Sequence, residues 1–509
     1  NKKSLYVLIK ITKINFTPTF MTIQNNQKIV NETPEQYKPV MQVFVDMCAI
    51  PHASTNSVPI TQHFKKWAET HGFEVTVDAT NNVLVKVPAS KGCENVPGIC
   101  LQGHTDMVAV KAPESTHDFS KDPLHLRIEN GWLYANNTTL GADDGMGVAL
   151  ACAIATDKSI KHGPLEILLT SDEEIGLIGA AALKKCLTSK YLLNLDTEDF
   201  GDICVSCAGG FRITFDKDFK TEAIPEGSHV FDLKISGYLG GHSGVEINQY
   251  RANAIKQMAR ILKNIQAPFQ IISIKGGQAH NAIPAIAECR IAAMCCGEAG
   301  EKIQEIFASV HQAFVMKEKN AKIELIPVTE NVKECFTVAD TNNIINFLLN
   351  APHGPVRFSQ EVKDFVETSF TTATVATQGN HIHILGSGRS CYEQEIDYLY
   401  QQCVALAELA GWKPSEQLSR YPGWPAQMES PLIQIVEQAY KKHCTEPVKI
   451  TAIHAGLEAG MICKVHPGME AISIGPTIVS PHSPQEKCKI DSIYKLFDIT
   501  KEIIENIAK

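Results

Sequence analysis

Short apolar runs alternate with amphipathic segments over much of the chain. VPGICLQGH (residues 96–104), PLEILLT (164–170) and YLLNLD (191–196) have the length and apolar character of buried strands. Helical spacing of apolar residues is present in EQYKPVMQVFVDMCAI (35–50) and GVALACAIATD (147–157). Strands that alternate with helices in this way predict an α/β domain, a mixed sheet with helices on both faces.

The pattern changes after about Cys207. Strands are predicted for FRITFDKDF, SHVFDLKISGY, FQIISIKGG and AIAECRIAAM, and helices for YRANAIKQMARILKNI and GEKIQEIFASVHQAFV. The strand, loop and helix order of the first part then returns near the end of the chain. We therefore expect a disordered or added extension (1–20), a catalytic domain in two parts (21–206 and 414–509), and an inserted α+β domain (207–413).

Composition excludes some classes of function. The 509 residues carry a formal charge of -9 without a long Lys/Arg block, which argues against nucleic-acid binding. No apolar run reaches the roughly 18 residues that a membrane-spanning helix needs, so we expect no membrane partner. The 16 cysteines are scattered, which is typical of a reduced, cytoplasmic protein rather than a disulfide framework.

Acidic residues and histidines gather where the predicted strands end. Ligands of α/β sheets bind at the carboxyl ends of the strands, so we expect these side chains to meet there. The strings that contain them are QGHTD, LGADDGMG, SDEE, NLDTED and, near the end of the chain, GPTIVSPHSPQE. Their candidate functional residues are His104, Asp106, Asp143, Asp144, Glu173, Glu174, Asp196 and His482.

Each string alone has an ordinary structural explanation. A His-x-Asp pair is more often a surface hydrogen-bond pair than a ligand set, and Asp-Asp before Gly is typical of a turn or a helix N-cap. The three consecutive acids from Asp172 to Glu174 would repel one another without a positive counter-charge. Imidazole and carboxylate groups gathered at strand ends of one sheet are the ligands that two divalent cations require. Together the strings predict a dimetal site.

The chain resembles the family of dimetal peptidases that includes tripeptidase T and carnosinase. The strings that carry the resemblance are LQGHTDMV, GADDGMGVA, TSDEEIGLIGA, LLNLDTED, GGHSGVEI, RANA, VETS, YPGW, IHAGLEAG and HSPQE, in this order. Within the family the chain is most similar to the aminoacyl-histidine (Xaa-His) dipeptidases, from about Gln36 to the C-terminus. The resemblance implies a hydrolase, a metal-dependent dipeptidase.

The resemblance assigns the metal ligands residue by residue. His104 and Asp196 would bind one metal ion, and Glu174 and His482 would bind the second. Asp143 would bridge both ions together with a water molecule. Two divalent ions are implied, with Zn²⁺ expected and Co²⁺ or Mn²⁺ as alternatives.

Two further residues of the same strings would act on the water and on the ligands. Glu173 would be the general base, which takes a proton from the bridging water and passes it to the leaving amine. Asp106 would hydrogen-bond His104 and fix its tautomer. Asp144 is not expected to bridge, because the family pattern aligns the first Asp of the pair with the bridging residue.

The resemblance implies that the inserted domain is a lid and dimerisation domain. This domain and the last part of the chain would supply the substrate contacts. His242 in GGHSG would stabilise the tetrahedral oxyanion, in many relatives in the partner subunit's site. Arg389 would pair with the free carboxylate of the substrate, and Asn281 would add a polar contact. His454 would line the pocket, and Glu458 would recognise the free α-amino group.

We therefore expect a cytoplasmic, homodimeric dipeptidase that hydrolyses unblocked dipeptides and favours Xaa-His substrates. A tripeptide aminopeptidase and an N-acyl amino-acid amidohydrolase are alternatives, because the metal ligands alone do not separate them. A metal-stabilised binding protein without catalysis is a third alternative. The presence of Glu173, Asp106 and His242 argues against it, because a scaffold needs no general base.

Overall fold

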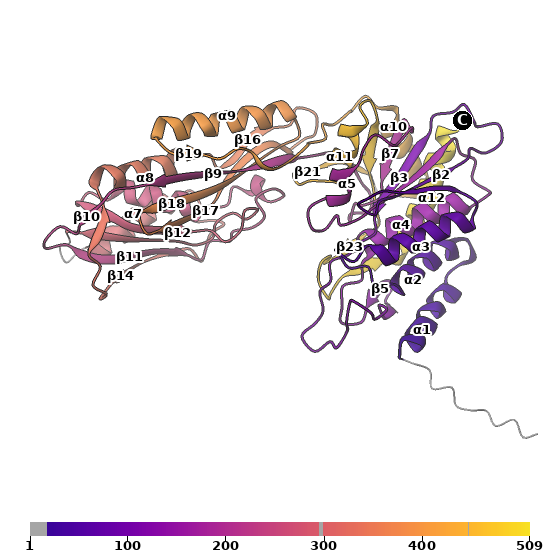
Figure 1. The fold of residues 1–509 in the computed structure, drawn as a ribbon, viewed down its shortest axis with the longest axis horizontal. Coiled ribbons are helices and arrows are strands. Elements are labelled where there is room, and N and C mark those ends of the chain that lie inside the picture. Colours follow the sequence, from indigo (N-terminus) through magenta and orange to yellow (C-terminus); the bar gives the residue numbers. More distant parts are fainter. Residues whose placement is uncertain (1–17, 295–298, 446) are drawn as a thin grey trace, which may run out of the picture. The chain divides into compact units, whose positions relative to one another are not determined.

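The computed structural model describes residues 18–294, 299–445 and 447–509, and its chain divides into two units (Figure 1). Unit 1 contains the described residues up to Ile203, with 429–449 and 468–509. Unit 2 contains 204–428 and 450–467. Two segments that are predicted to be in the catalytic domain fall in unit 2. Residues 414–428 do so because β20 (Leu418–Tyr421) hydrogen-bonds to β9 (Gly209–Asp218). Residues 450–467 also belong to unit 2, where the amide of Ala208 donates to the carbonyls of Ile453 and Ala455.

The first helix differs from the sequence prediction. Residues 1–17 of the expected extension lie outside the described residues, but α1 (Pro18–Glu32) begins inside the segment that was treated as an extension. The side-chain amide of Asn26 donates to the carbonyl of Leu124, and its Oδ1 accepts from the amide of Leu126. The expectation of a disordered segment is therefore wrong for residues 18–20, since this helix begins before Met21 and belongs to unit 1.

The sheet of unit 1 is mixed, as predicted. β3 (Ile99–His104) pairs parallel with both β6 (Leu165–Thr170) and β7 (Tyr191–Asn194), and β7 pairs parallel with β22 (Glu470–Ser473). The hairpin strands β1 (Glu74–Val77) and β2 (Val83–Val87) extend the sheet beyond β6 by antiparallel pairing. The three apolar runs of the sequence are therefore the neighbouring strands β6, β3 and β7, and their carboxyl ends lie at one edge.

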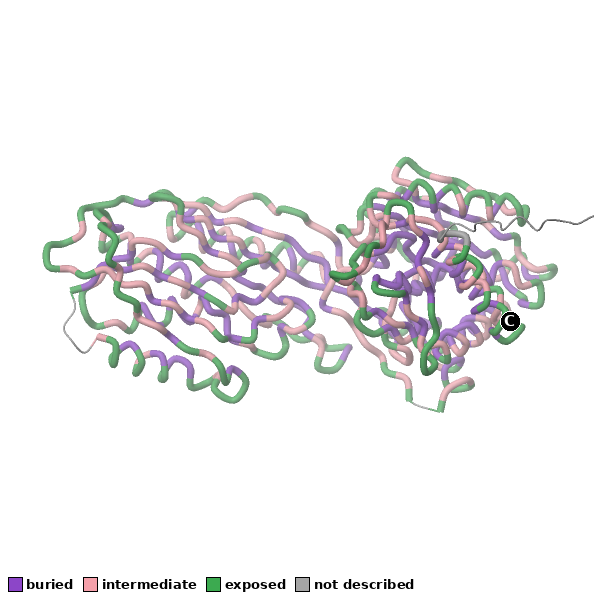
Figure 2. Tube along the Cα trace, turned by 90° about the horizontal axis from the view of Figure 1, so that it is seen from below, coloured by how far each residue is buried: buried purple, intermediate pink, exposed green. Residues whose placement is uncertain are grey.

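Helices bury the sheet of unit 1. α4 (Ala142–Thr156) is buried along almost its whole length, because it packs against β3 and β6 on one side and α2 and α12 on the other. Figure 2 shows the buried residues concentrated in the interior of each unit. The other elements of unit 1 are η1 (Glu35–Tyr37), α2 (Lys38–Cys48), α3 (Val58–Thr70), β4 (Leu126–Glu129), β5 (Trp132–Ala135), α5 (Ile178–Ala182), α10 (Pro431–His443), β23 (Ile478–Val479), β24 (Lys487–Lys489) and α12 (Ile490–Ile507). The chain passes between the units within β8 (Asp202–Cys207) and at β21 (Lys449–Ile453).

Unit 2 is an α+β structure built on one large antiparallel sheet. Its strands follow the order β14-β11-β13-β12-β17-β18-β9-β19, with β16 beside β17 and β20 beside β9. Alternate residues of the strands join a core with the helices α6 to α9, among them Phe215 and Ile384. The strands are β9, β10 (Thr221–Ala223), β11 (His229–Ser236), β12 (Phe269–Gly276), β13 (Ala287–Ala293), β14 (Lys322–Pro327), β15 (Glu334–Phe336), β16 (Gly354–Phe358), β17 (Val366–Gln378), β18 (His381–Ser390), β19 (Lys413–Pro414) and β20. The helices are η2 (Ile247–Gln249), α6 (Ala254–Asn264), α7 (Ala299–His311), α8 (Val338–Asn350), α9 (Glu393–Ala410) and α11 (Glu458–Val465).

Candidate metal centre

The predicted ligands of unit 1 meet at one edge of its sheet. His104 is the last residue of β3, Glu174 follows β6, and Asp196 follows β7. Asp143 lies in the first turn of α4, and His482 lies in the loop after β23. Segments far apart in the chain thus deliver their side chains to one place, because parallel strands end together and α4 packs on β3.

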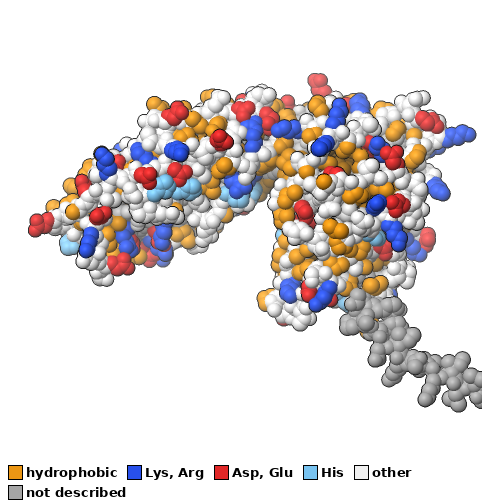
Figure 3. Space-filling view, viewed as in Figure 1, with side chains coloured by type: hydrophobic (Ala, Val, Ile, Leu, Met, Phe, Trp, Pro, Cys, Tyr) orange, Lys and Arg blue, Asp and Glu red, His pale blue; other side chains and the backbone are white. Residues whose placement is uncertain are grey.

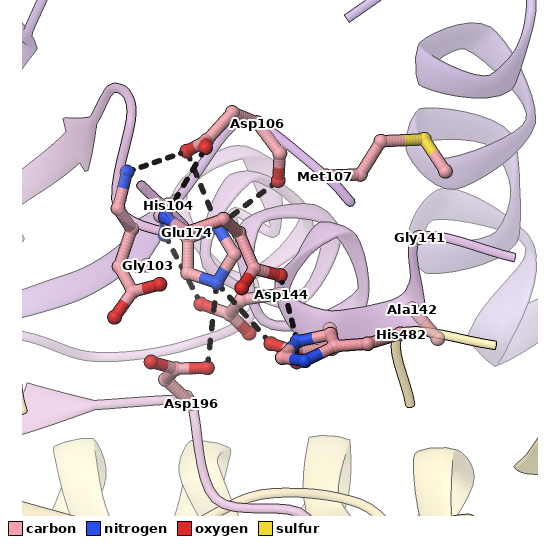
Figure 4. A network of polar contacts seen from close by, with 12 residues as sticks. Gly103, His104, Asp106, Met107, Gly141, Ala142, Asp144, Glu174, Asp196 and His482 are labelled. Carbon is pink, nitrogen blue, oxygen red and sulfur yellow. Dashed lines mark hydrogen bonds and ion pairs between the residues drawn. The ribbon is translucent and has the colours of Figure 1, made fainter. Parts of the chain in front are cut away.

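The ligand atoms form two groups that share Asp143. Nε2 of His104 lies 3.2 Å from Oδ1 of Asp143 and 3.6 Å from Oδ1 of Asp196. Nε2 of His482 lies 3.1 Å from Oδ2 of Asp143 and 3.0 Å from Oε1 of Glu174. Within each group the ligand atoms all lie within 4.8 Å of one another. The two oxygens of Asp143 therefore face different imidazoles, as in a carboxylate that binds two cations. Figure 4 shows His104, Glu174, Asp196 and His482 gathered at this place.

Asp106 connects the loops around these ligands. Its carboxylate accepts hydrogen bonds from the Ser54 hydroxyl at 2.7 Å, the Glu173 amide at 2.9 Å and the Glu174 amide at 3.3 Å. Nδ1 of His104 lies 3.5 Å from the same carboxylate and 3.0 Å from the Asp106 carbonyl. This side chain therefore positions the backbone of the acidic loop and directs Nε2 of His104 toward Asp143.

Asp144 lies apart from the ligand groups, in a pocket made by two glycines. The peptide between Asp143 and Asp144 is cis. A Cβ atom on Gly103 would lie 2.2 Å from Oδ2 of Asp144, and one on Gly147 would lie 2.2 Å from Oδ1. The amide of His104 donates to the same carboxylate at 3.2 Å. The glycines are thus needed here because any side chain would displace this carboxylate.

Glu486 is a buried acid that the sequence analysis did not single out. One of its oxygens accepts from the amides of Leu140 at 2.7 Å and Gly141 at 3.1 Å. The other accepts from Ala142 at 2.8 Å and Asp143 at 3.5 Å. Glu486 thus caps the start of α4 and holds the backbone that carries Asp143. The sequence feature from which Glu486 could be identified is its place four residues after His482, in HSPQE.

The charges of this centre are unbalanced in favour of carboxylates. Burial raises the pKa of Asp196 well above its ordinary value, and it does the same for Asp144. Burial also raises the pKa of Glu198 to about 7, with a further contribution from Asp143. Hydrogen bonds to Asp143 and Glu174 raise the pKa of His482 to about 11. Crowded carboxylates with two imidazoles are a donor set that fits divalent cations.

Glu198 is a second residue that the sequence analysis did not single out. It lies two residues after Asp196, inside the string NLDTED that was already noted. Its position near Asp143 is visible only in the structure, because these two residues come from segments that are distant in sequence.

His242 of unit 2 is held in one tautomer. Its Nδ1 accepts hydrogen bonds from the amides of Gly244 at 3.2 Å and Val245 at 3.1 Å. Burial lowers the pKa of His242, and the positive charge of Arg389 lowers it further. The neutral imidazole therefore carries its proton on Nε2, where it can be donated to a ligand.

Arg389 lies on β18 and is nine-tenths buried, with 9% of its surface exposed. One guanidinium nitrogen donates to the hydroxyl of Tyr421 at 2.8 Å. Its Nε is buried and has no hydrogen-bond partner among the described residues. A buried donor without a partner is costly, so this guanidinium is poised for an acceptor from a ligand.

The other predicted substrate residues also lie in unit 2. Nε2 of His454 lies 2.7 Å from the Ser369 hydroxyl, while its buried Nδ1 has no hydrogen-bond partner among the described residues. Burial, with the nearby charge of Arg389, lowers the pKa of His454 to about 3. His454 lines a pocket together with Gly244, Phe365 and neighbouring residues. That this pocket receives the substrate stays a prediction.

Two remaining candidates have less defined surroundings. Glu458 is fully buried and is the first residue of α11. The carbonyl of Asn281 accepts from the Ser243 amide at 2.8 Å, which places Asn281 beside the loop of His242.

Among the described residues, no helix combines the length and apolar character that crossing a membrane requires.

Comparisons with known proteins agree with this architecture. The cytosol non-specific dipeptidase of Escherichia coli (strain K12) is 36% identical over 480 residues, which are 92% of this chain and 98% of that protein. The crystal structure of an aminoacylhistidine dipeptidase from Vibrio alginolyticus superposes with a TM-score of 0.87 at 35% identity, covering 94% of this chain and 98% of that one. An aminopeptidase from Bacillus cereus shares the fold, with a TM-score of 0.55 at 17% identity, over 93% of this chain and 99% of that one.

The family model for Peptidase family M20/M25/M40 matches residues 100–506, which include every predicted ligand of the metal centre. The fold expected from the resemblance, an α/β domain interrupted by an α+β domain, is confirmed by these structural relatives. The metallopeptidase assignment made from the sequence is confirmed by the family model and by the relative from Escherichia coli. The chain belongs to Peptidase family M20/M25/M40, a family of metallopeptidases.

Proposed function

We propose that this protein is a metal-dependent dipeptidase that hydrolyses unblocked dipeptides and favours Xaa-His substrates. The observation that carries the proposal is the pair of ligand groups that share Asp143, with a carboxylate oxygen of Glu173 within 4.8 Å of ligand atoms of His104 and Glu174. A carboxylate that can accept a proton beside a dimetal ligand set is the arrangement that hydrolysis of an amide requires.

We assign the residues of unit 1 as follows. His104 and Asp196 would hold one cation, Glu174 and His482 would hold the other, and Asp143 would contribute to both. Divalent cations bound here would supply Lewis acidity for attack on the peptide carbonyl. Glu173 takes the proton of the attacking water and delivers it to the leaving amine. Asp106 fixes the tautomer of His104.

Residues of unit 2 bind the substrate in this proposal. Nε2–H of His242 donates to the oxygen that becomes negative in the transition state, a role supported by the two amides that fix its tautomer. Arg389 binds the substrate's carboxylate, a role supported by its buried Nε. His454 and Asn281 line the side-chain pocket, and Glu458 binds the α-amino group.

The substrate class is supported by the relatives and by one feature of unit 2. The Escherichia coli relative is named a non-specific dipeptidase, and the Vibrio alginolyticus relative is named an aminoacylhistidine dipeptidase. His454 lines a pocket of unit 2, and its buried Nδ1 has no hydrogen-bond partner among the described residues. Both observations support a polar substrate side chain, such as imidazole, beside this residue. We therefore place Xaa-His dipeptides, including β-Ala-His, first among the substrates.

We further propose Zn²⁺ as the cation, two ions per chain, and a homodimer in the cytoplasm. Zn²⁺ binds carboxylate and imidazole ligands of this kind, as Co²⁺ and Mn²⁺ also do. The described cysteines are free thiols, which is consistent with a reducing compartment. Metal analysis of the purified protein and analytical ultracentrifugation test the ion count and the dimer.

The test of the activity is a panel of β-Ala-His, Gly-His, Gly-Leu and Ala-Ala with a tripeptide and an N-acetyl amino acid. The protein is stripped of metal and reloaded with Zn²⁺, Mn²⁺ or Co²⁺. Preferential hydrolysis of the His-containing dipeptides, lost on stripping, is the expected result. Cleavage of the tripeptide or the acetyl compound instead would overturn the substrate class and keep the site. Absence of hydrolysis in the loaded protein would overturn the enzymatic proposal.

A further inference from the structure

A second group of metal-ligating side chains lies in unit 2, on the neighbouring strands β9 and β18. The two strands pair antiparallel, with His383 opposite Asp216 and His381 opposite Asp218. Side chains two positions apart on a strand lie on the same face. Ile382, between the two histidines, is fully buried in the core that the helices cover. The two histidines and two acids therefore share the opposite face of the sheet.

The atoms of this group are arranged around one oxygen. Nδ1 of His383 lies 2.7 Å from Oδ1 of Asp216, and Nε2 of His381 lies 3.0 Å from the same oxygen. One ligand atom from each of the three residues lies within 4.8 Å of the other two. A cation at their centre would thus receive two imidazole nitrogens and one carboxylate oxygen.

Two further side chains orient these ligands. Nδ1 of His381 lies 2.8 Å from Oδ1 of Asp218, so this carboxylate holds the ring with Nε2 directed at Asp216. The hydroxyl of Thr214 donates to the other oxygen of Asp216 at 3.0 Å. A carboxylate behind a histidine ligand is a recurrent feature of metal sites, because it fixes the tautomer and raises the basicity of the ligand nitrogen.

The side chains of the three ligands are 30% to 42% exposed. Figure 3 shows pale blue histidine side chains beside red acidic ones on the surface of unit 2. An ion can therefore enter from solution, and water can complete its coordination. Two imidazoles with one carboxylate favour borderline ions such as Zn²⁺, Ni²⁺ or Cu²⁺ over Ca²⁺ and Mg²⁺, which prefer oxygen ligands.

We propose that Asp216, His381 and His383 form a peripheral binding site for a divalent transition-metal ion, with Asp218 orienting His381. The bound ion cross-links β9 to β18. Arg389 is on the same strand, six residues beyond His383, and at about 3.3 Å per residue it lies roughly 20 Å away. The ion therefore takes no part in hydrolysis, and it stabilises the strand pair that carries Arg389.

The test is a count of Zn²⁺ ions on the full-length protein, by equilibrium dialysis and metal analysis at fixed free Zn²⁺. Replacing both histidines (His381→Ala with His383→Ala) is expected to remove one ion per chain and to leave dipeptide hydrolysis unchanged. Asp218→Asn is expected to weaken the binding of this ion by roughly 10- to 100-fold, as loss of a carboxylate behind a ligand does. The matched control is His229→Ala, an exposed histidine on β11 of the same sheet, which should retain every ion.

An equal ion count in the parent and the double variant would overturn the site and would mean that the four side chains form only ion pairs. Thermal unfolding in the presence of a chelator tests whether the double variant is folded like the parent when no metal is bound. The parent and the double variant should unfold within a few degrees of each other there. Added Zn²⁺ should stabilise the parent more than the double variant, because both keep the centre of unit 1 and only the parent has the further site. Because the count does not depend on turnover, the result stands whether or not the proposed peptidase activity is found.

Discussion

The candidate metal centre of unit 1 and the cluster of Arg389, His242 and His454 in unit 2 have charges that are unbalanced in opposite directions. In unit 1, carboxylates including Asp143, Glu174 and Asp196 surround two imidazoles. In unit 2, a guanidinium lies near neutral histidines, and buried nitrogens of Arg389 and His454 have no hydrogen-bond partner among the described residues. The donor set of the first region therefore fits cations, and the unpaired nitrogens of the second fit the anionic or hydrogen-bond-accepting group that we propose for it. The excess carboxylates in unit 1 and the unpaired nitrogens in unit 2 thus indicate the charge of the ligand that each region would bind.

The largest expected effect concerns Glu173, the acid of unit 1 that we assign to proton transfer rather than to metal binding. Glu173→Gln should lower kcat by about 10²- to 10⁴-fold, because general acid-base catalysis contributes about that much. The metal content should stay at the parent level. Kinetics with Xaa-His dipeptides and metal analysis on the same sample provide the check. A variant that lost its metal as well would show that Glu173 is a ligand.

The next effect tests the anion requirement of unit 2. Arg389→Lys should lower kcat/KM for dipeptides by roughly 10- to 100-fold, since an ammonium cannot form the bidentate pair that a guanidinium forms with a carboxylate. C-terminally amidated dipeptides, which have no carboxylate, should be hydrolysed equally by parent and variant. An equal loss on both substrates would show that Arg389 has only a structural function.

A smaller effect is expected for the cap on α4. In Glu486→Gln the new amide group would place a donor against backbone amides that now donate to a carboxylate. We expect the metal affinity of the centre to fall by about 10-fold, as for other residues that support ligands. Titration of the apo-protein with Zn²⁺ measures it. Glu429→Gln, at an exposed position of unit 1, is the control and should match the parent.

The smallest effect concerns the hydrogen bond between Ser369 and His454. Ser369→Ala should raise KM for Xaa-His dipeptides by only a few-fold, because one hydrogen bond contributes about 0.5–1.5 kcal/mol. KM for Gly-Leu should change less, since that substrate offers no imidazole to His454. A uniform change in kcat for all substrates would show that His454 does not contact the side chain of the substrate.

The sequence predicted the strands and the ligand groups of unit 1 because both are local patterns. An apolar run followed by QGHTD or SDEE indicates where a strand ends and which side chains follow it. The mixed sheet then brings those ends together, as the parallel register of β6, β3 and β7 confirms. The assignment of His104, Glu174 and Asp196 to one place needed only the order of apolar and polar residues.

Other parts of the site depend on distances across the chain. Glu486 caps a helix more than three hundred residues earlier, and nothing in the local string specifies that partner. The proximity of Glu198 to Asp143 likewise arises only when β7 and α4 pack in one unit. Helix α1 was missed because its apolar residues show weak periodicity, so its stability comes from contacts such as those of Asn26.

The two glycines around Asp144 have a consequence for how this sequence can change. Gly103 precedes a ligand, and Gly147 follows the Asp-Asp pair, yet both face the same carboxylate. A larger residue at Gly103 becomes acceptable only after Asp144 has become smaller, whereas at Gly147 the Cβ atom and the carbonyl of Leu195, each 2.8 Å from such a side chain, would have to move as well. Gly103 and Asp144 are therefore expected to change together in any lineage of related chains, and Gly147 is expected to change least. A variant library that randomises Gly103 and Asp144 singly would discard combinations that are viable jointly.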